Sequence, residues 1–232
     1  AAAAPRELSV WAVMRQAPPL PFLPESAHGK EVVVFALLCH GDLEAGERLA
    51  AKVLDFGDPL GSMLGRQPYA GFQTAFDPLL APGARNYWKS HNFVEVSDGL
   101  IDAVIQGLET LPGPECDTFI AQLGGAMSDV DEADTAYAGR NANFMMNVHG
   151  RWQDPADDDA IRNWARQVFH DTTPFATGGG YVNFFTEDES SRVDSAYSQN
   201  YLRLQQLKQQ YDPDNLFRIN QNIAPLSFAQ SA

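Results

Sequence analysis

The residues whose types and spacing could do chemistry lie near the end of the chain, in Gly178-Gly-Gly-Tyr-Val-Asn-Phe-Phe185. We predict a short strand from Tyr181 to Phe185, because aromatic and β-branched residues follow the glycines. Tyr181 and Asn183 would then point to the same face of that strand. A phenol titrates near ~10, so it needs a lowered pKa or a carboxylate partner to accept a proton near neutral pH. On the residues alone, Tyr181 could equally be a strand aromatic that fills the core.

Three more polar residues lie at or after predicted strands. Gln122 and Asn147 belong to neighbouring predicted strands and could line the same pocket, although each could equally be a polar residue of an edge strand. Asp129 follows two glycines and could be the partner of Tyr181, a second base or a plain loop carboxylate. These side chains are the other candidates for a site.

Four motifs follow one another over nearly fifty residues near the end of the chain: Tyr181-x-Asn183, Asn200-Tyr-x-Arg-Leu204, Lys208-x-x-Tyr-Asp-Pro-x-Asn-x-Phe217 and Asn220-Gln-x-Ile-x-Pro225. This succession resembles the C-terminal segment of the berberine-bridge-enzyme-like FAD-linked oxidases, which belong to the vanillyl-alcohol-oxidase-type flavoproteins. The stretch Arg85-Asn-Tyr-Trp-Lys-Ser90 also resembles a signature of that family's substrate domain.

The resemblance implies an FAD-dependent oxidoreductase that transfers a hydride from a small organic substrate to flavin. Tyr181 occupies the place of the tyrosine that faces the flavin and can serve as base in sugar-oxidising and antibiotic-modifying members. Asn183 would reach a polar flavin edge with its amide. The run from Gly124 to Asp129 resembles the Gly-Gly-x-Met-x-Glu of plant members, where the glutamate is the base. Tyr181 and Asp129 are therefore the catalytic candidates.

The sequence departs from the family pattern at three of these positions. Phe184 replaces a frequent second tyrosine, Asp129 replaces the glutamate of plant members, and Asn147 replaces a strand glutamine found in many members. These changes argue against the plant alkaloid reaction. They leave bacterial sugar, alcohol, nicotine-like or polyketide substrates open.

Composition and charge exclude other classes of protein. The 232 residues are 44% hydrophobic and 20% charged, which suits a globular chain with a real core. A net charge of −14 argues against nucleic acid or an anionic membrane as a partner. Cys39 and Cys116 lie in apolar runs and are expected to be buried thiols, and the five histidines show no metal-ligand spacing.

The start of the chain, Ala1-Ala-Ala-Ala-Pro-Arg-Glu7, shows no signal peptide and reads as a cut or an expression end. We therefore expect a cytoplasmic protein whose flavin-binding half precedes this part, and a chain that cannot hold FAD alone. The alternatives are a non-catalytic binding or scaffold protein derived from such an oxidase, or one half of a split oxidase.

Strand and helix patterns alternate irregularly along the chain. Strands are predicted at residues 8–15, 31–39, 116–123 and 143–152, with the second as a central strand. Helices are predicted from Asp42 to Gly57, from an Asp98 cap, from Asp154-Pro155 and between Tyr197 and Tyr211, where Pro213 stops the run. Residues 59–97 look irregular and aromatic.

This order favours an α+β fold, an antiparallel sheet with helices packed on one face. The predicted domains are residues 1–175, a substrate-binding domain, and residues 176–232, the C-terminal segment. The resemblance implies that the other face of the sheet covers the flavin ring and that the C-terminal segment packs on an FAD-binding domain.

Overall fold

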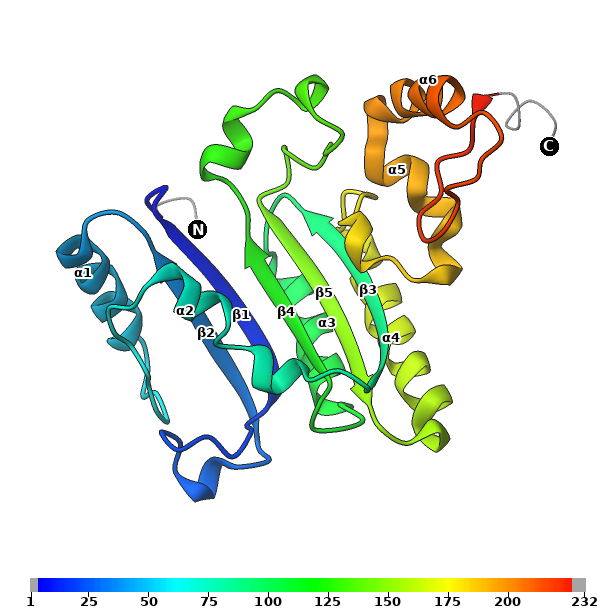
Figure 1. Ribbon diagram of the computed structural model, residues 1–232. Helices are drawn as coiled ribbons and strands as arrows, with labels where there is room; N and C mark the ends of the chain where they lie inside the picture. Colours follow the sequence, from blue (N-terminus) through cyan, green and yellow to red (C-terminus); the bar gives the residue numbers. More distant parts are fainter. Residues whose placement is uncertain (1–3, 227–232) are drawn as a thin grey trace.

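One antiparallel sheet of five strands organises the chain (Figure 1), as the sequence predicts. The computed structural model describes residues 4–226. The strands are β1 (Leu8–Gln16), β2 (Glu31–Cys39), β3 (Arg85–Phe93), β4 (Asp117–Gln122) and β5 (Phe144–Trp152), in the spatial order β2-β1-β4-β5-β3. The α-helices are α1 (Leu43–Leu54), α2 (Tyr69–Gln73), α3 (Asp98–Glu109), α4 (Asp158–Thr172), α5 (Val193–Tyr197) and α6 (Tyr201–Tyr211). Short 3-10 turns are Glu25–Ala27, Asp77–Leu80, Gly125–Asp129, Glu132–Asp134, Pro155–Asp157, Thr173–Phe175, Val182–Phe184, Glu187–Arg192 and Ser198–Asn200.

The hydrophobic core lies between the sheet and helices α3 and α4. Alternate residues of β5, among them Met146 and Val148, are fully buried in it with Leu100 of α3. The indole of Trp164 on α4 donates a hydrogen bond of 2.9 Å to the carbonyl of Gly107 on α3, which ties the two helices together. The intervening residues of β5 point to the opposite side of the sheet, which we call the open face.

Side-chain caps begin helices α1 and α3, with one difference from the sequence prediction. Asp42 accepts a hydrogen bond of 2.7 Å from the amide of Ala45 and caps α1 as predicted. The predicted Asp98 cap is wrong by one residue, because Ser97 accepts the Leu100 amide. Asp98 instead lies in the first turn, where a negative charge favours the helix dipole.

Two strand predictions are also corrected by the sheet. β2 is an edge strand and not a central one, although Val33, Val34 and Phe35 make it continuously apolar. Residues 85–93 are not irregular but form β3, which pairs with β5 along its whole length. The sequence pattern did not predict β3, because Lys89 and His91 are polar although they are buried on the side of the strand that faces the core.

The predicted strand from Tyr181 to Phe185 is absent. Residues 182–184 form a 3-10 turn, in which the amide of Phe184 donates to the carbonyl of Tyr181 at 2.9 Å. The helix that follows begins at Tyr201 and not at Tyr197, because Ser198 has a φ of +46° and interrupts the run. The predicted end at Tyr211 is confirmed.

Both cysteines are unpaired thiols, with Cys116 fully buried and Cys39 partly buried. Between residues 4 and 226, no helix has the length and apolar character needed to cross a bilayer.

Candidate active site on the open face

The C-terminal segment folds around the outer edge of β3 (yellow to red in Figure 1). The amide of Thr177 donates to the carbonyl of Asn92 at 2.9 Å, and the Asn92 amide donates to the carbonyl of Gly179 at 3.2 Å. Gly180 passes so close that a Cβ there would lie 2.7 Å from the Phe185 ring and 3.0 Å from the carbonyl oxygen of Ser90. This close approach carries residues 181–184 onto the open face.

Aromatic rings form a continuous row across the open face. We refer to this set of residues as the aromatic row: Trp11, Phe119, Trp88, Phe184, Tyr181 and Tyr137. Trp11 stacks on Phe119 with ring centroids 4.8 Å apart. Phe184 lies 5.1 Å from both Trp88 and Tyr181, and 6.0 Å from Phe119, measured between ring centroids. Tyr137 lies 6.4 Å from Tyr181 and continues the row. Such a surface suits contact with a flat, conjugated ring.

Tyr181 and Asn183 contact each other directly. The side-chain amide of Asn183 donates a hydrogen bond of 2.7 Å to the phenol oxygen of Tyr181. Tyr181 is half-buried and Asn183 is exposed. Because the phenol oxygen accepts this bond, its own O–H remains for another partner. The sequence predicted these two side chains on one face of a strand, whereas in the structure a turn brings them into contact.

Asn147 lies on the open face of β5, buried between Ser90 of β3 and Phe119 of β4. Its side-chain nitrogen has no hydrogen-bond partner among the described residues, and the same holds for polar side-chain atoms of Trp88, Ser90 and Asn92 on β3. An unpaired buried polar group costs about 1–3 kcal/mol. Four such atoms on one face indicate a place where a polar molecule binds.

Trp88, Ser90 and Asn92 were not among the predicted site residues, because residues 59–97 were expected to be irregular. Their spacing of two residues could have indicated a common site, since residues i, i+2 and i+4 share one face of a strand.

Gln122 and Asn147 do not share a face of the sheet. Gln122 is opposite Phe144 in the register, and Asn147 is opposite Phe119. Because side chains alternate along a strand, Gln122 is on the face that α3 and α4 cover. The structure therefore brings Asn147 to the aromatic row but leaves Gln122 on the other side.

Asp129 ends a 3-10 turn and forms an exposed ion pair with Arg6. One hydrogen bond, from Nη1 of Arg6 to Oδ1 of Asp129, is 3.1 Å long. This bonding lowers the pKa of Asp129, and 57% of the side chain is exposed. Its hydrogen bonds thus go to Arg6 rather than to Tyr181.

Charged residues fasten the C-terminal segment to the helix-covered side of β3. We refer to this set of residues as the ionic clamp: Lys89, Arg166, Asp188, Glu189 and Arg192. The buried ammonium of Lys89 lies 2.8 Å from a carboxylate oxygen of Asp188 and 3.4 Å from one of Glu189. Arg166 lies 3.2 Å from Asp188, and Arg192 pairs with Glu189. The segment therefore holds β3 from both faces, with Tyr181 on one side and the clamp on the other.

The clamp changes the acidity of Asp188. Partial burial opposes its ionisation, but hydrogen bonds from Lys89, Thr186 and Tyr87 outweigh that effect and hold the pKa well below its usual range. Tyr87 donates its hydroxyl to Asp188 at 2.5 Å and accepts a bond of 2.9 Å from Arg166. The carboxylate is thus ionised across the neutral range.

Comparison with known proteins gives a family for this arrangement. The family model described as "Berberine and berberine like" matches residues 180–224, which include Tyr181 and Asn183. An FAD-linked oxidoreductase of Dictyostelium discoideum is 27% identical over 198 residues, 84% of this chain and 43% of that protein. The aclacinomycin-N/aclacinomycin-A oxidase of Streptomyces galilaeus is 30% identical over 122 residues, 44% of this chain and 22% of the oxidase.

Solved structures share the fold. A berberine-bridge-enzyme-like protein of Arabidopsis thaliana superimposes with a TM-score of 0.76 at 16% identity, covering 97% of this chain and 51% of that one. Berberine bridge enzyme from Eschscholzia californica gives 0.72 at 17% identity, covering 95% of this chain and 49% of that one.

The fold is that of berberine-bridge-enzyme-like structures, and the relatives matched by sequence are FAD-linked oxidoreductases. Residues 180–224 match the berberine-bridge-enzyme-like family model, and FAD is the expected cofactor. The chain spans about half the length of the relatives it matches or less. The relatives come from organisms as different as Bacillus subtilis, Penicillium rubens and Berberis wilsoniae, so they do not establish a bacterial source.

The residues present fit one side of a bound flavin. The aromatic row offers an apolar surface of ring faces and edges, and the unpaired atoms of Asn147 and Ser90 offer hydrogen bonds beside it. Between residues 4 and 226, no group of three or more His, Cys, Asp or Glu side chains could hold a metal ion.

Proposed function

We propose that this chain is the substrate-side part of an FAD-dependent oxidoreductase that oxidises a small organic substrate. The observation that carries the proposal is the position of Tyr181. It lies in the segment matched by the family model, bonded to Asn183, between Phe184 and Tyr137 in the aromatic row on the open face.

FAD, when bound, accepts a hydride from a C–H bond of the substrate. The residues of this chain bind and orient the substrate and move the proton. Tyr181 would take the proton from the adjacent O–H, N–H or C–H group, and Asn183 would hold the phenol in place. Asn147 would bind a polar group of the substrate from below the aromatic row. Both Tyr181 and Asn183 would face the flavin.

Asp129 is the second proposed base, and Gln122 the second proposed substrate contact. The ion pair with Arg6 lowers the pKa of Asp129 and makes it a weaker base. Gln122 would have to reach the substrate from the end of β4, because its face of the sheet is covered by helices. Asn147 is therefore the better supported of the two substrate contacts.

We further propose that an FAD-binding domain or chain covers the open face and the C-terminal segment. In this division, residues 1–175 are the substrate-binding domain and residues 176–232 are the segment that packs on the flavin-binding part. Leu216, Phe217 and Ile219 are 74%, 82% and 84% exposed, an arrangement that suits a covered surface better than one facing water. Without that part, the chain is expected to be inactive.

The proposed substrates are sugars, alcohols or natural products. A relative is named an aclacinomycin oxidase, and a solved structure of the same fold is a glycopeptide hexose oxidase with teicoplanin bound. Another relative is named tetrahydroberberine oxidase. The aromatic row would accept any of these through a flat or apolar surface. A cytoplasmic location belongs to the same proposal.

The visible absorption spectrum tests whether the chain is one side of a flavin site. The purified chain should be colourless alone and should become yellow when co-expressed with the flavin-binding part of the protein. A flavin spectrum from the chain alone would overturn the proposed division. A preparation that stays colourless with both parts would favour a binding or scaffold protein.

A further inference from the structure

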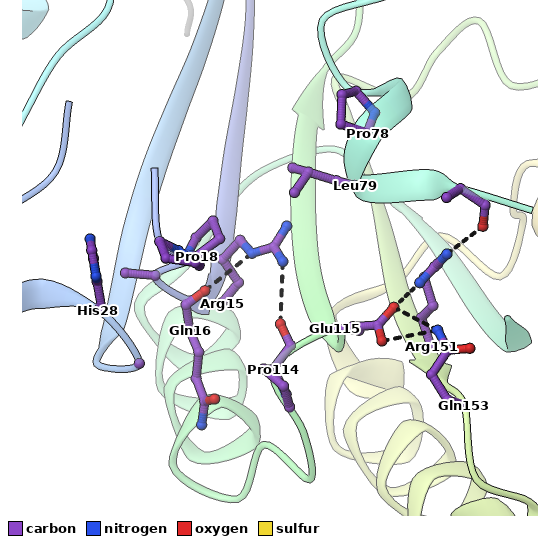
Figure 2. Close-up of a pocket in the computed structure, with 14 residues that line it drawn as sticks. Arg15, Gln16, Pro18, His28, Pro78, Leu79, Pro114, Glu115, Arg151 and Gln153 are labelled. Carbon is purple, nitrogen blue, oxygen red and sulfur yellow. Dashed lines mark hydrogen bonds and ion pairs between the residues drawn. The ribbon is translucent and has the colours of Figure 1, made fainter. Parts of the chain in front are cut away.

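A cavity of about 510 Å³ lies at the end of the open face away from Tyr181 (Figure 2). It forms where β1 and β5 end and β4 begins. Figure 2 shows Arg15 and Arg151 on two sides of it, with Glu115 between them and Leu79 above. Arginine side chains in a cavity raise the question of which negative charges balance them.

Arg15 has no acidic partner among the described residues. Its guanidinium donates to the backbone carbonyls of Gln16 and Pro114, each at 3.2 Å. Asp117 is opposite Arg15 in the sheet register, but its carboxylate faces the imidazole of His149 at 3.5 Å. A guanidinium carries five N–H donors in a planar fork that suits carboxylate and phosphate oxygens. Arg15 thus keeps its charge and the donors not used by these two carbonyls for a ligand.

The positive charge of Arg151, the second arginine, is balanced by a carboxylate. Arg151 is buried, pairs with Glu115 and donates to the carbonyl of Ala81 at 2.5 Å. Glu115 also accepts a bond of 3.1 Å from the amide of Gln153, so its carboxylate is occupied. Of the two arginines in the cavity, Arg15 is therefore the one without a carboxylate at ion-pair distance among the described residues.

His28 supplies a further polar atom. His28 is one of the residues that line the cavity, and its Nε2 is buried and has no hydrogen-bond partner among the described residues. Figure 2 shows His28 on the far side of Gln16 from Arg15, at the margin of the cavity. A buried nitrogen without a partner is costly unless a bound group satisfies it.

We propose that this cavity binds the anionic group of a small molecule, a carboxylate or a phosphate, through Arg15. The net charge of the chain is −14, so anions are repelled by most of its surface. The positive charge of Arg15 inside a concave site therefore contrasts with most of the surface. The site lies beyond the end of the aromatic row: Arg151 follows His149, the register partner of Trp88, by two residues on β5, roughly 7 Å along the strand.

Anion binding by the 232-residue chain tests the proposal without any flavin. Sodium phosphate and sodium benzoate are titrated separately into the chain by calorimetry at low, constant ionic strength. We expect saturable binding of at least one anion, weakened ~10-fold or more by Arg15→Gln because the charge is lost. Phosphate binding alone would assign a phosphate ester, and benzoate binding alone a carboxylate.

Arg48→Gln is the matched control, because it removes the same charge from an exposed site on α1. It should leave binding unchanged. Arg15→Lys keeps the charge without the planar fork and should bind more weakly than the parent chain but more tightly than Arg15→Gln. Circular dichroism confirms that each variant folds. The proposal is overturned if neither anion saturates, or if Arg48→Gln weakens binding as much as Arg15→Gln.

Discussion

His91 shows how strongly its surroundings change what one residue can do. The ring is buried on the helix-covered side of β3 and stacks on Phe169 with ring centroids 4.0 Å apart. Burial lowers the pKa of His91 to about 4, against an ordinary value of 6.5, and the nearby charge of Arg192 lowers it too. A hydrogen bond to the carbonyl of Phe169 acts in the opposite direction. The folded protein therefore holds this imidazole neutral.

The neutral imidazole predicts that the protein loses stability in weak acid. Between pH 6.5 and 4, the unfolded chain binds a proton at this histidine and the folded chain does not. His91 should therefore lower the free energy of unfolding by about 3 kcal/mol over that interval. Chemical denaturation at both pH values should show a difference that His91→Phe removes. His170→Phe, at an exposed histidine of α4, should retain this difference. If the parent protein and both variants showed the same difference in unfolding free energy between pH 6.5 and 4, His91 would not be its source.

Asp129 gives a second prediction at the residue scale. Because it is exposed and paired with Arg6, we expect Asp129→Asn to change flavin reduction in the FAD-containing protein by less than ~3-fold. Rapid-mixing spectroscopy under anaerobic conditions measures this rate. A fall of ~10²-fold would instead make Asp129 the base.

Single residues of the site were predictable where a motif fixed them. Tyr181 and Asn183 were identified from their motif, and the structure shows them bonded. Arg6 could not be predicted as the partner of Asp129, since no local pattern links residues 123 positions apart. Such contacts depend on the packing of the whole chain.

At the scale of elements, the segment of residues 177–192 is the part of the chain that positions the site residues. It bonds to the edge of β3 through Thr177 and Gly179, and the ionic clamp holds its far end. The clamp includes Lys89 and Glu189, whose side chains are 6% and 3% exposed. Breaking a buried ion pair leaves an uncompensated charge and costs about 3–5 kcal/mol.

Removal of the clamp cation should therefore release the segment. In Lys89→Met, we expect hydrogen exchange of residues 177–192 to accelerate by at least ~10-fold, with β4 and β5 less affected. Lys52→Met, at an exposed lysine of α1, serves as the control. Unchanged exchange in Lys89→Met would show that backbone bonds to β3 hold the segment without the clamp.

The elements show why sequence patterns predicted some strands and missed others. β1, β4 and β5 carry apolar residues on the core side and were predicted within one or two residues. β3 carries Lys89 and His91 there, and their buried partners come from distant segments. Residues 181–185 have the composition of a strand, but the close approach at Gly180 turns them onto the open face instead.

At the scale of the whole molecule, two apolar surfaces within residues 4–226 bear on the proposed contact with a flavin-binding part. One is the open face, where Trp11 is 42% exposed. The other is the C-terminal segment beyond α6, with Leu216, Phe217 and Ile219. We attribute both to contact with the flavin-binding part.

Substitutions in the second surface should weaken that contact without unfolding the chain. Phe217→Ser and Ile219→Ser should each reduce the affinity for the flavin-binding part by ~10-fold or more, because each removes apolar area from the interface. The thermal midpoint of the isolated chain should not change. Leu60→Ser, also exposed but between α1 and α2, is the control. Equal affinities in all variants would mean that the segment contacts something else.

The central claim is that Tyr181 moves the proton during flavin reduction. Its most direct test is the anaerobic rate of flavin reduction by substrate in the FAD-containing protein carrying Tyr181→Phe, with Tyr69→Phe, an exposed tyrosine of α2, as control. We predict that Tyr181→Phe lowers the rate by ~10²-fold or more with FAD still bound, and that Tyr69→Phe has no effect. A rate in Tyr181→Phe equal to that of the parent protein would contradict the claim and remove Tyr181 from the mechanism.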